Sequence, residues 1–243
     1  MTDMLIVVPA RGGSKRLPQK NLRPLAGKSL LAHTAAAIAG AALTAPVLLT
    51  TDDDTIAAEG RRLGWLVPFR RPAELSTDDA TTLATVLHAL DWFRTEKGSD
   101  PNAVMVLQPT SPFRGAACLK SAVAALARRP DIDSVIAMTA LQLPPARLFT
   151  ADANGIARPL GAEDGRRPVY APNGALYLVR TKALRRQGTV YADAILPLVL
   201  DGARAIDIDT PADWRLAEAA LAAGLPPEAS TFDPAPSVAA PVA

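Results

Sequence analysis

The sequence predicts an α/β fold built on a mostly parallel sheet. Short apolar runs rich in β-branched residues, beginning with residues 4–8, alternate with segments of helical composition. The first run is continuously apolar, as expected for a strand that helices cover on both faces of a parallel sheet. With 243 residues and a hydrophobic fraction of 49%, the chain can bury the core of one α/β domain with a small appended lobe.

The expected elements follow one another in βαβ order. Strands are expected at residues 4–8, 47–51, 66–69, 103–107, 134–139, 174–179 and 205–208. Helices are expected at residues 29–42, 54–63, 82–94, 119–128 and 211–223. Asp52, Asp53 and Asp54 supply capping side chains for the second helix, and Thr210 followed by Pro211 has the form of a helix start. Ligands of such sheets bind beyond the carboxyl ends of the strands, which draws attention to the loops that follow residues 8, 51 and 107.

Two stretches depart from this pattern. Prolines and glycines interrupt it between residues 141 and 170, and we expect residues 141–172, approximately, to form an insertion or small lobe. After Gly224 the chain is rich in proline and small residues, which cannot build a core, so residues 226–243 are expected to form a disordered tail. The main domain is expected to span residues 1–225.

The charge balance and the cysteine count exclude several classes of protein. The chain has 26 basic and 24 acidic residues, so it has no global basic field that would favour nucleic acid as a partner. The single cysteine, Cys118, excludes an intramolecular disulfide and fits a reducing cytoplasm. The first apolar run is too short for a signal peptide, and we expect no membrane span.

The loop after the first strand carries a dense set of cations and small residues. The cations are Arg11, Lys15, Arg16, Lys20 and Arg23, and the small residues are Gly12, Gly13 and Ser14. Glycines let backbone N–H groups approach an anion, and Arg and Lys neutralise phosphates. A solvated basic loop is the alternative, but the position directly after a buried strand favours phosphate binding. The chain lacks the dinucleotide-binding and P-loop spacings here, so a kinase or a dinucleotide fold is disfavoured.

A pair of carboxylates precedes the last expected helix. Side chains alternate along a strand, so Asp207 and Asp209 would share one face while Ile206 and Ile208 take the other. Paired carboxylates are suited to Mg²⁺. Helix capping is the alternative: it explains Thr210 and Asp213 but leaves Asp207 without a role, and we therefore expect a metal site.

Five segments resemble one known family. They are residues 9–21 (PARGGSKRLPQKN), 71–75 (RPAEL), 107–114 (LQPTSPFR), 173–177 (NGALY) and 206–211 (IDIDTP). The first resembles the signature loop of the acylneuraminate cytidylyltransferases, the CMP-sialic acid synthetases, and the others resemble later motifs of that family in the same order. The resemblance implies a Rossmann-like nucleotidyltransferase fold, a mid-chain dimerisation lobe, a homodimer and a cytoplasmic enzyme that uses CTP and Mg²⁺.

The resemblance also implies roles for individual residues. Catalysis would rest on Arg11, Lys20, Asp207 and Asp209, and the two aspartates would hold the Mg²⁺. The nucleotide would be bound by Ala10, Gly12, Gly13, Ser14, Asn21, Arg71, Thr82 and Gln108, with Arg71 and Gln108 at the cytosine. The sugar would be bound by Arg147, Asn173 and Tyr177. The sequence offers no obvious general base.

The acceptor sugar is expected to be a nine-carbon acid such as N-acetylneuraminate. Legionaminate and pseudaminate are the first alternatives, Kdo is a further one, and a non-catalytic nucleotide-binding relative is a more distant one. A sugar carboxylate needs a cationic partner, which Arg147, Arg166 or Arg167 would supply. A solvated loop is an equal alternative for Arg166 and Arg167.

Overall fold

The computed structural model describes residues 3–143, 147–151, 153, 156–159 and 169–224. Its centre is a six-stranded sheet with the strand order β10-β6-β9-β5-β1-β4. The strands are β1 (Met4–Pro9), β4 (Val47–Thr50), β5 (Ala103–Val106), β6 (Ser134–Leu141), β9 (Val169–Arg180) and β10 (Ile195–Val199). β1 pairs in parallel with β4 and β5, and β6 pairs in parallel with β10. The predicted mostly parallel α/β fold is confirmed.

Strand β9 runs antiparallel to both of its neighbours, β5 and β6. Tyr177 stands opposite Val106, near the carboxyl end of β5, whereas Arg180 stands opposite Ala103 at its start. The first half of β9 therefore lies at the same edge of the sheet as the carboxyl ends of the parallel strands. This direction brings residues 173–177 toward the loop that follows β5.

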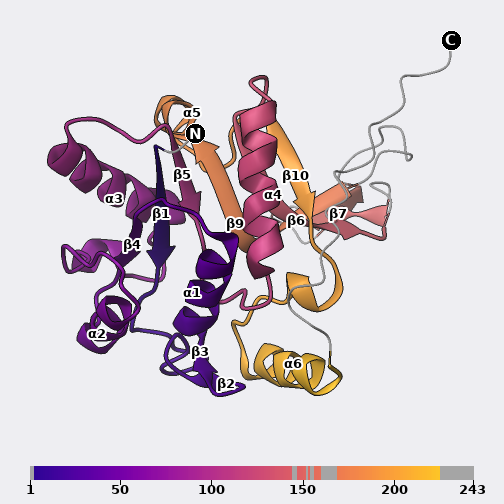
Figure 1. Cartoon of the computed structure of the whole chain (residues 1–243). Helices are drawn as coiled ribbons and strands as arrows, with labels where there is room; N and C mark the ends of the chain where they lie inside the picture. Colours follow the sequence, from indigo (N-terminus) through magenta and orange to yellow (C-terminus); the bar gives the residue numbers. More distant parts are fainter. Residues whose placement is uncertain (1–2, 144–146, 152, 154–155, 160–168, 225–243) are drawn as a thin grey trace, which may run out of the picture.

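Helices cover both faces of the sheet (Figure 1). They are α1 (Leu30–Ala41), α2 (Asp54–Arg62), α3 (Thr82–Lys97), α4 (Gly115–Arg128), α5 (Thr181–Gln187) and α6 (Pro211–Ala222), with short 3-10 turns at η1 (Ala73–Leu75) and η3 (Gly202–Ala205). The apolar residues of α1, α2 and α4 share one buried cluster with the sheet, and those of α3 and α5 share a second. The expected capping by Asp53 is confirmed, since its side chain accepts hydrogen bonds from the N–H groups of Thr55 and Ile56.

A third, smaller apolar cluster lies at the carboxyl edge of the sheet. It joins Leu17 of the loop after β1 to Ile206, Ile208 and Trp214 of the segment around the start of α6. Figure 1 places α6 at this end of the molecule, beside the two-residue strands β2 (Pro24–Leu25) and β3 (Lys28–Ser29). This packing holds the loop after β1, which carries the cations (the cationic loop), against residues 206–209, which carry the two carboxylates. The two segments are far apart in the sequence.

Two expected strands are wrong. Residues 205–208 make no ladder, because the N–H of Ile208 donates instead to the carbonyl of Thr110 at 2.8 Å. Within residues 66–69 only Leu66 forms a bridge, and Pro68 has no N–H with which to continue one. The sequence reading also missed α5 and β10. Pro197 obscures the strand pattern in β10, yet proline is tolerated there because β10 is an edge strand.

The expected lobe at residues 141–172 is described only in part. Its described portion contains a small antiparallel pair, β7 (Phe149–Ala151) and β8 (Ala157–Pro159), beyond the ends of β6 and β9. The expected tail at residues 226–243 lies outside the described residues.

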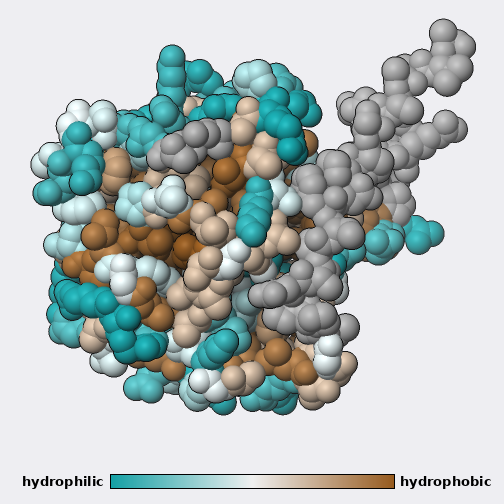
Figure 2. Space-filling view, in the orientation of Figure 1, coloured by the Kyte–Doolittle hydropathy of each residue, from teal (hydrophilic) through white to brown (hydrophobic). Residues whose placement is uncertain are grey.

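The surface of the molecule is mixed in character. On the face shown in Figure 2, apolar side chains gather toward the middle and polar side chains occupy much of the rim. In the part of the chain that the structure describes, none of the helices is long and apolar enough to cross a membrane.

Candidate functional site

A polar cleft of about 300 Å³ opens at the carboxyl edge of the sheet. Its walls come from the loop after β1, the first turn of α3, the loop after β5 and the segment before α6. Eight of the residues expected to bind the nucleotide or the metal line it: Arg11, Ser14, Lys20, Asn21, Thr82, Gln108, Asp207 and Asp209. Folding thus brings to one cavity side chains from four separate segments of the chain.

Three other expected nucleotide residues lie at the root of the cationic loop. The N–H of Ala10 donates to a carbonyl of β4 at 3.1 Å, and the N–H of Gly12 donates to Oδ1 of Asp52 at 2.9 Å. A Cβ on Gly12 would lie 2.7 Å from Oδ2 of Asp53, so only glycine permits this close approach of the two loops. Gly13 is exposed, and a Cβ there would have open space around it.

Asn21 fixes the course of the loop from within. It is only 5% exposed, and its Nδ2 donates to the carbonyl of Arg11 at 3.1 Å. Its own carbonyl accepts a hydrogen bond from the N–H of Leu31 in α1. The side chain of Arg11 therefore leaves the loop from a position that the first helix holds in place.

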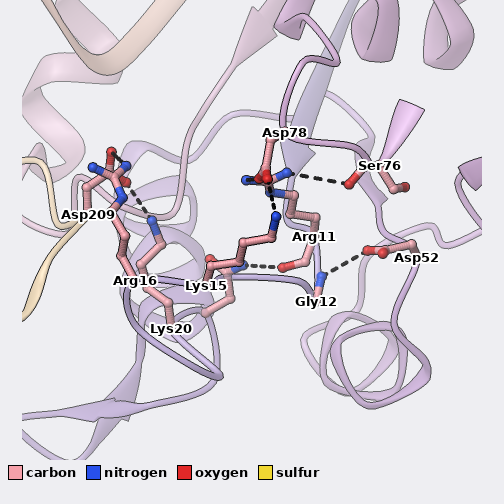
Figure 3. A network of polar contacts seen from close by, with 10 residues as sticks. Arg11, Gly12, Lys15, Arg16, Lys20, Asp52, Ser76, Asp78 and Asp209 are labelled. Carbon is pink, nitrogen blue, oxygen red and sulfur yellow. Dashed lines mark hydrogen bonds and ion pairs between the residues drawn. The ribbon is translucent and has the colours of Figure 1, made fainter. Parts of the chain in front are cut away.

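One carboxylate outside the cleft lining, Asp78, binds two cations of the loop (Figure 3). Its Oδ1 lies 2.7 Å from Nη2 of Arg11, and its Oδ2 lies 2.6 Å from Nζ of Lys15. Hydrogen bonds from Lys15 and Arg11 hold the pKa of Asp78 below its ordinary value. The sequence reading did not single out Asp78, because it stands in a polar segment whose spacing suggests no chemistry.

A second carboxylate, Asp209, binds the other two cations that line the cleft (Figure 3). Its Oδ1 lies 2.7 Å from Nζ of Lys20, and its Oδ2 lies 2.8 Å from Nη2 of Arg16. Burial raises the pKa of Asp209, but the hydrogen bond and charge of Lys20 outweigh this, and the net pKa is lowered. Four of the five cations of the loop are thus paired with Asp78 and Asp209, whereas Arg23 lies over the ring of Trp214.

Asp207 has a different environment. Its side chain is half-buried, and its Oδ1 has no hydrogen-bond partner. Burial raises the pKa of Asp207, a hydrogen bond from Thr110 opposes the rise, and the charge of Asp209 adds to it. An unpartnered carboxylate oxygen in a partly buried site is costly unless a cation or a donor approaches it.

Both interpretations of this acidic segment have structural support. Thr210 and Asp213 form a capping box at the start of α6, as the capping interpretation requires. Asp207 takes no part in it, and Ile206 and Ile208 point into the apolar cluster while Asp207 and Asp209 line the cleft. The described residues hold no group of three or more metal-ligating side chains. A two-carboxylate site with an unpartnered oxygen nevertheless fits Mg²⁺, which takes its remaining ligands from water and phosphate.

The two residues expected at the cytosine occupy different positions. Gln108 lines the cleft, where its amide group can both donate and accept hydrogen bonds. Arg71 is buried, and its Nε and Nη2 donate to the hydroxyl and carbonyl of Thr50 at the end of β4. Burial lowers the pKa of Arg71 to about 10. Arg71 lines a neighbouring hollow with Asp52 and Ser76 rather than the main cleft.

The residues expected at the sugar lie on or near β9. Nδ2 of Asn173 donates to Oγ1 of Thr139 at 3.2 Å. Tyr177 is buried and packs edge-on against Tyr191 with ring centroids 5.9 Å apart, and burial together with that neighbour raises its pKa. Arg147 is exposed, just before β7, and does not line the cleft. Arg166 and Arg167 lie outside the described residues.

The sequence is similar to a group of enzymes that handle CMP-sugars. A family model described as "Cytidylyltransferase" matches residues 5–153. The chain is 35% identical to CMP-N,N'-diacetyllegionaminic acid synthase of Legionella pneumophila over 88% of this chain and 94% of that protein. It is 29% identical to N-acylneuraminate cytidylyltransferase of Streptococcus agalactiae over 86% of this chain, but the match spans only 51% of that protein. It is 26% identical to pseudaminic acid cytidylyltransferase of Campylobacter jejuni over 88% of this chain and 94% of that protein.

Solved structures share the fold at lower sequence identity. One is CMP:2-keto-3-deoxy-manno-octonic acid synthetase complexed with CTP, with a TM-score of 0.66 and 17% identity over 91% of this chain and 99% of that chain. Another is 4-diphosphocytidyl-2C-methyl-D-erythritol synthase of Anaerococcus prevotii, with a TM-score of 0.64 and 13% identity over the same shares. These likenesses confirm the Rossmann-like nucleotidyltransferase fold.

Proposed function

The chain belongs to the cytidylyltransferase family, and we propose that it transfers CMP from CTP to the anomeric hydroxyl of a nine-carbon acidic sugar. The observation that carries the proposal is the convergence in one cleft of the cationic loop, Gln108 and the carboxylates Asp207 and Asp209. Cations neutralise a triphosphate, an amide pairs with the polar edge of a pyrimidine, and paired carboxylates hold a hard cation. CTP with its metal ion requires all three.

The reaction is a direct nucleotidyl transfer. The oxygen of the anomeric hydroxyl attacks the α-phosphorus of CTP, its proton is released, and the bond from that phosphorus to the bridging oxygen breaks so that pyrophosphate leaves. Arg11 and Lys20 hold the phosphates by exchanging Asp78 and Asp209 for phosphate oxygens. Positioning and charge neutralisation supply most of the acceleration in such transfers.

The remaining nucleotide residues shape the pocket. Ser14 and Asn21 line the cleft from the loop after β1, and Thr82 lines it from the first turn of α3. Gln108 contacts the cytosine, and Arg71 supports base recognition from the adjoining hollow. A site built to pair with particular polar edges disfavours the wrong base, because that base leaves buried groups unpaired.

Mg²⁺ is the proposed cofactor, and Asp207 and Asp209 are the residues that would hold it. The unpartnered Oδ1 of Asp207 and the position of both carboxylates in the cleft support this assignment. When bound, the ion would neutralise charge on the α-phosphate and lower the pKa of the attacking hydroxyl. Nζ of Lys20 contacts Asp209 in this structure, and its exchange to a phosphate oxygen would leave this carboxylate available to the ion.

The identity of the sugar is the finer part of the proposal. N-acetylneuraminate, N,N'-diacetyllegionaminate and pseudaminate all remain candidates, with Kdo as a further alternative. N,N'-diacetyllegionaminate is the first to test, since the relative named for it matches at 35% identity over nearly its whole length. Asn173 and Tyr177 are proposed to line the sugar pocket, and Arg147 is proposed to pair with the sugar carboxylate.

The experiment is to measure pyrophosphate release from CTP and Mg²⁺ with each of these four sugars in turn. Turnover of one or more nine-carbon acids is expected, and it should stop when EDTA removes the metal. Turnover of Kdo alone would overturn the nine-carbon assignment, and no turnover with any sugar would overturn the catalytic one. Arg147→Ala should raise KM for the sugar, whereas Arg129→Ala, which removes an exposed arginine paired with Asp131, should not.

We also propose that the chain acts as a homodimer in the reducing cytoplasm. Phe149 in β7 is 59% exposed and Leu143 is 48% exposed, so the described part of the lobe presents large apolar side chains that a second copy would cover. The buried thiol of Cys118 fits a compartment in which cysteines stay reduced.

A further inference from the structure

Arg114 is a buried cation directly behind the cleft. It is 1% exposed, and its guanidinium makes its three hydrogen bonds to neutral oxygens. Burial lowers the pKa of Arg114 to about 10, so the side chain stays charged at neutral pH. A guanidinium buried without a carboxylate in hydrogen-bond contact is destabilising in itself, which calls for an explanation beyond packing.

The three acceptors belong to three different elements. Nη1 donates to the carbonyl of Gln108 at 2.8 Å and to the carbonyl of Ala175 at 2.6 Å, and Nη2 donates to Oγ1 of Thr34 at 2.8 Å. Gln108 lies in the loop after β5, Ala175 lies in β9, and Thr34 lies in α1. A single nitrogen therefore joins two parts of the site. One is the loop after β5, proposed to bind the nucleotide (the nucleotide side, with the loop after β1), and the other is β9, proposed to bind the sugar (the sugar side).

The carbonyl of Ala175 stands where the sheet is irregular. The register between β6 and β9 shifts between the pairs Ile136–Tyr177 and Met138–Pro172, so several residues of β9 face one residue of β6. Such bulges leave backbone groups outside the ladder and occur next to functional sites, where they redirect side chains. Arg114 satisfies one of these backbone groups and so stabilises the bulge that carries Asn173.

The loop after β5 and strand β9, which Arg114 joins, are in close contact. A Cβ on Gly174 would lie 2.7 Å from Oε1 of Gln108 and 3.4 Å from Oδ2 of Asp207. The side chain proposed for the base, the carboxylate proposed for the metal and the strand proposed for the sugar thus meet at one glycine. A small displacement of β9 relative to the loop would disturb all three.

We propose that Arg114 is a positioning residue that couples base recognition to placement of the acceptor sugar, by holding the Gln108 loop and the Asn173 bulge at a fixed separation. This inference rests on the proposed function. It requires arginine rather than lysine, because the planar guanidinium directs donors along several fixed directions at once, whereas an ammonium group on a flexible chain does not.

The chain offers a matched control in Arg180. Its Nε donates to the carbonyl of Ile132 at 2.9 Å, and its Nη2 donates to the carbonyls of Leu126 and Arg129 at 2.9 and 3.1 Å. Arg180 is thus also a brace for backbone carbonyls, but it lies at the other end of β9, away from the cleft. Arg114→Lys and Arg180→Lys make the same chemical change in the two places.

The experiment measures the affinities of both variants for CTP and UTP by calorimetry without sugar, their kcat and KM with the best sugar, and their melting temperatures. In Arg114→Lys, the CTP-to-UTP affinity ratio should fall about tenfold, the effect of one misaligned hydrogen bond. Its kcat should fall about 10²-fold, as a displacement near 1 Å can cause. In Arg180→Lys the melting temperature should fall, but the ratio and kcat should stay near those of the wild type.

A folded Arg114→Lys protein with wild-type selectivity and kcat would overturn the inference, and so would equal kinetic losses in Arg180→Lys. If Arg114→Lys does not fold, Thr34→Val removes one acceptor and leaves the two carbonyl contacts. It should lower the ratio to a smaller degree, and an unchanged ratio would again overturn the inference. Failure of the wild type to turn over any sugar would instead count against the proposed function, while the CTP and UTP affinities would still decide the role of Arg114.

Discussion

Arg11 and Lys20 reach the cleft from a loop that directly follows the parallel strand β1, whereas Asn173 reaches it from β9, which runs against both of its neighbours. The loop is held by local contacts: Asn21 binds the carbonyl of Arg11, and Gly12 binds Asp52. The segment around Asn173 is held by Thr139, by an irregular register and by the distant Arg114. The nucleotide side therefore depends mainly on a loop and its anchors, and the sugar side depends on long-range packing.

This difference has a consequence for variation in function. We expect that a change in the lobe or in β9 can alter the acceptor sugar without altering the cationic loop, because that loop is held by its own contacts with Asn21 and Asp52. The names of the relatives share a cytidylyl or CMP group and differ in the sugar. Substitutions on each side can show whether the two sides are separable to this degree.

The largest expected effect belongs to Asp207, at the point where the two sides meet. Asp207→Asn should lower kcat by about 10²–10³-fold, the range found when a group that stabilises developing charge is removed. Asp213→Ala is the control, since Asp213 belongs to the capping box: it should cost about 1 kcal/mol of stability and change kcat little. Steady-state rates across a Mg²⁺ titration check both. Near-normal turnover of Asp207→Asn would remove the metal assignment and leave only the capping interpretation.

Gln108 tests whether base recognition belongs to the nucleotide side alone. Gln108→Ala should lower the preference for CTP over UTP by about 10- to 100-fold, because the base loses its hydrogen-bonding partner in the cleft. KM for the sugar should change much less if the two sides are separable. The measurement is kcat/KM for each nucleotide at saturating sugar, and equal losses for CTP and UTP would contradict the role of Gln108.

The order of strands and helices on the nucleotide side was predictable from the sequence for a physical reason. Buried parallel strands are continuous apolar runs, and each is followed by a polar loop at the ligand edge, so both the elements and the candidate residues are visible in one segment. For Ile206 and Ile208 the predicted strand is wrong, but the predicted alternation of side chains is present. They form no strand, yet the extended chain still alternates, and it directs Asp207 and Asp209 into the cleft.

The features that could not be predicted depend on distant partners. The pairing of Asp78 with Arg11 spans 67 positions, and no local spacing encodes it. Arg114 ends a segment that the resemblance had marked, but its role requires the carbonyl of Ala175, which lies 61 residues further along. The direction of β9 was equally hidden, since an apolar run indicates a strand without indicating which way that strand runs.

The proposed homodimer can be tested at the exposed apolar residues of β7, on the sugar side. Phe149→Glu places a charge on an exposed apolar position of β7 and should weaken the dimer by about tenfold or more, because an unpaired charge would have to be buried at the contact. Leu216→Glu is the control, since Leu216 is 57% exposed but lies on α6. Light scattering across a dilution series gives the molar mass. A shift toward monomer in Leu216→Glu but not in Phe149→Glu would assign the contact to α6 instead.

The smallest expected effect concerns Asp78, on the nucleotide side. Its carboxylate binds Arg11 and Lys15, and in the proposed reaction the triphosphate would take its place at these two cations. Asp78→Asn weakens this internal competitor, so the affinity for CTP should rise about two- to fivefold, the scale of an exposed ion pair. Asp79→Asn removes the same charge from the next residue, whose carboxylate makes neither contact, and it should raise the affinity less.

Calorimetric titration with CTP at two salt concentrations separates the effects of Asp78→Asn and Asp79→Asn, since general attraction is screened more strongly than a direct contact. Equal gains in both variants would mean that Asp78 acts only through overall charge, and a loss of affinity in Asp78→Asn would mean that it positions the two cations for the phosphates.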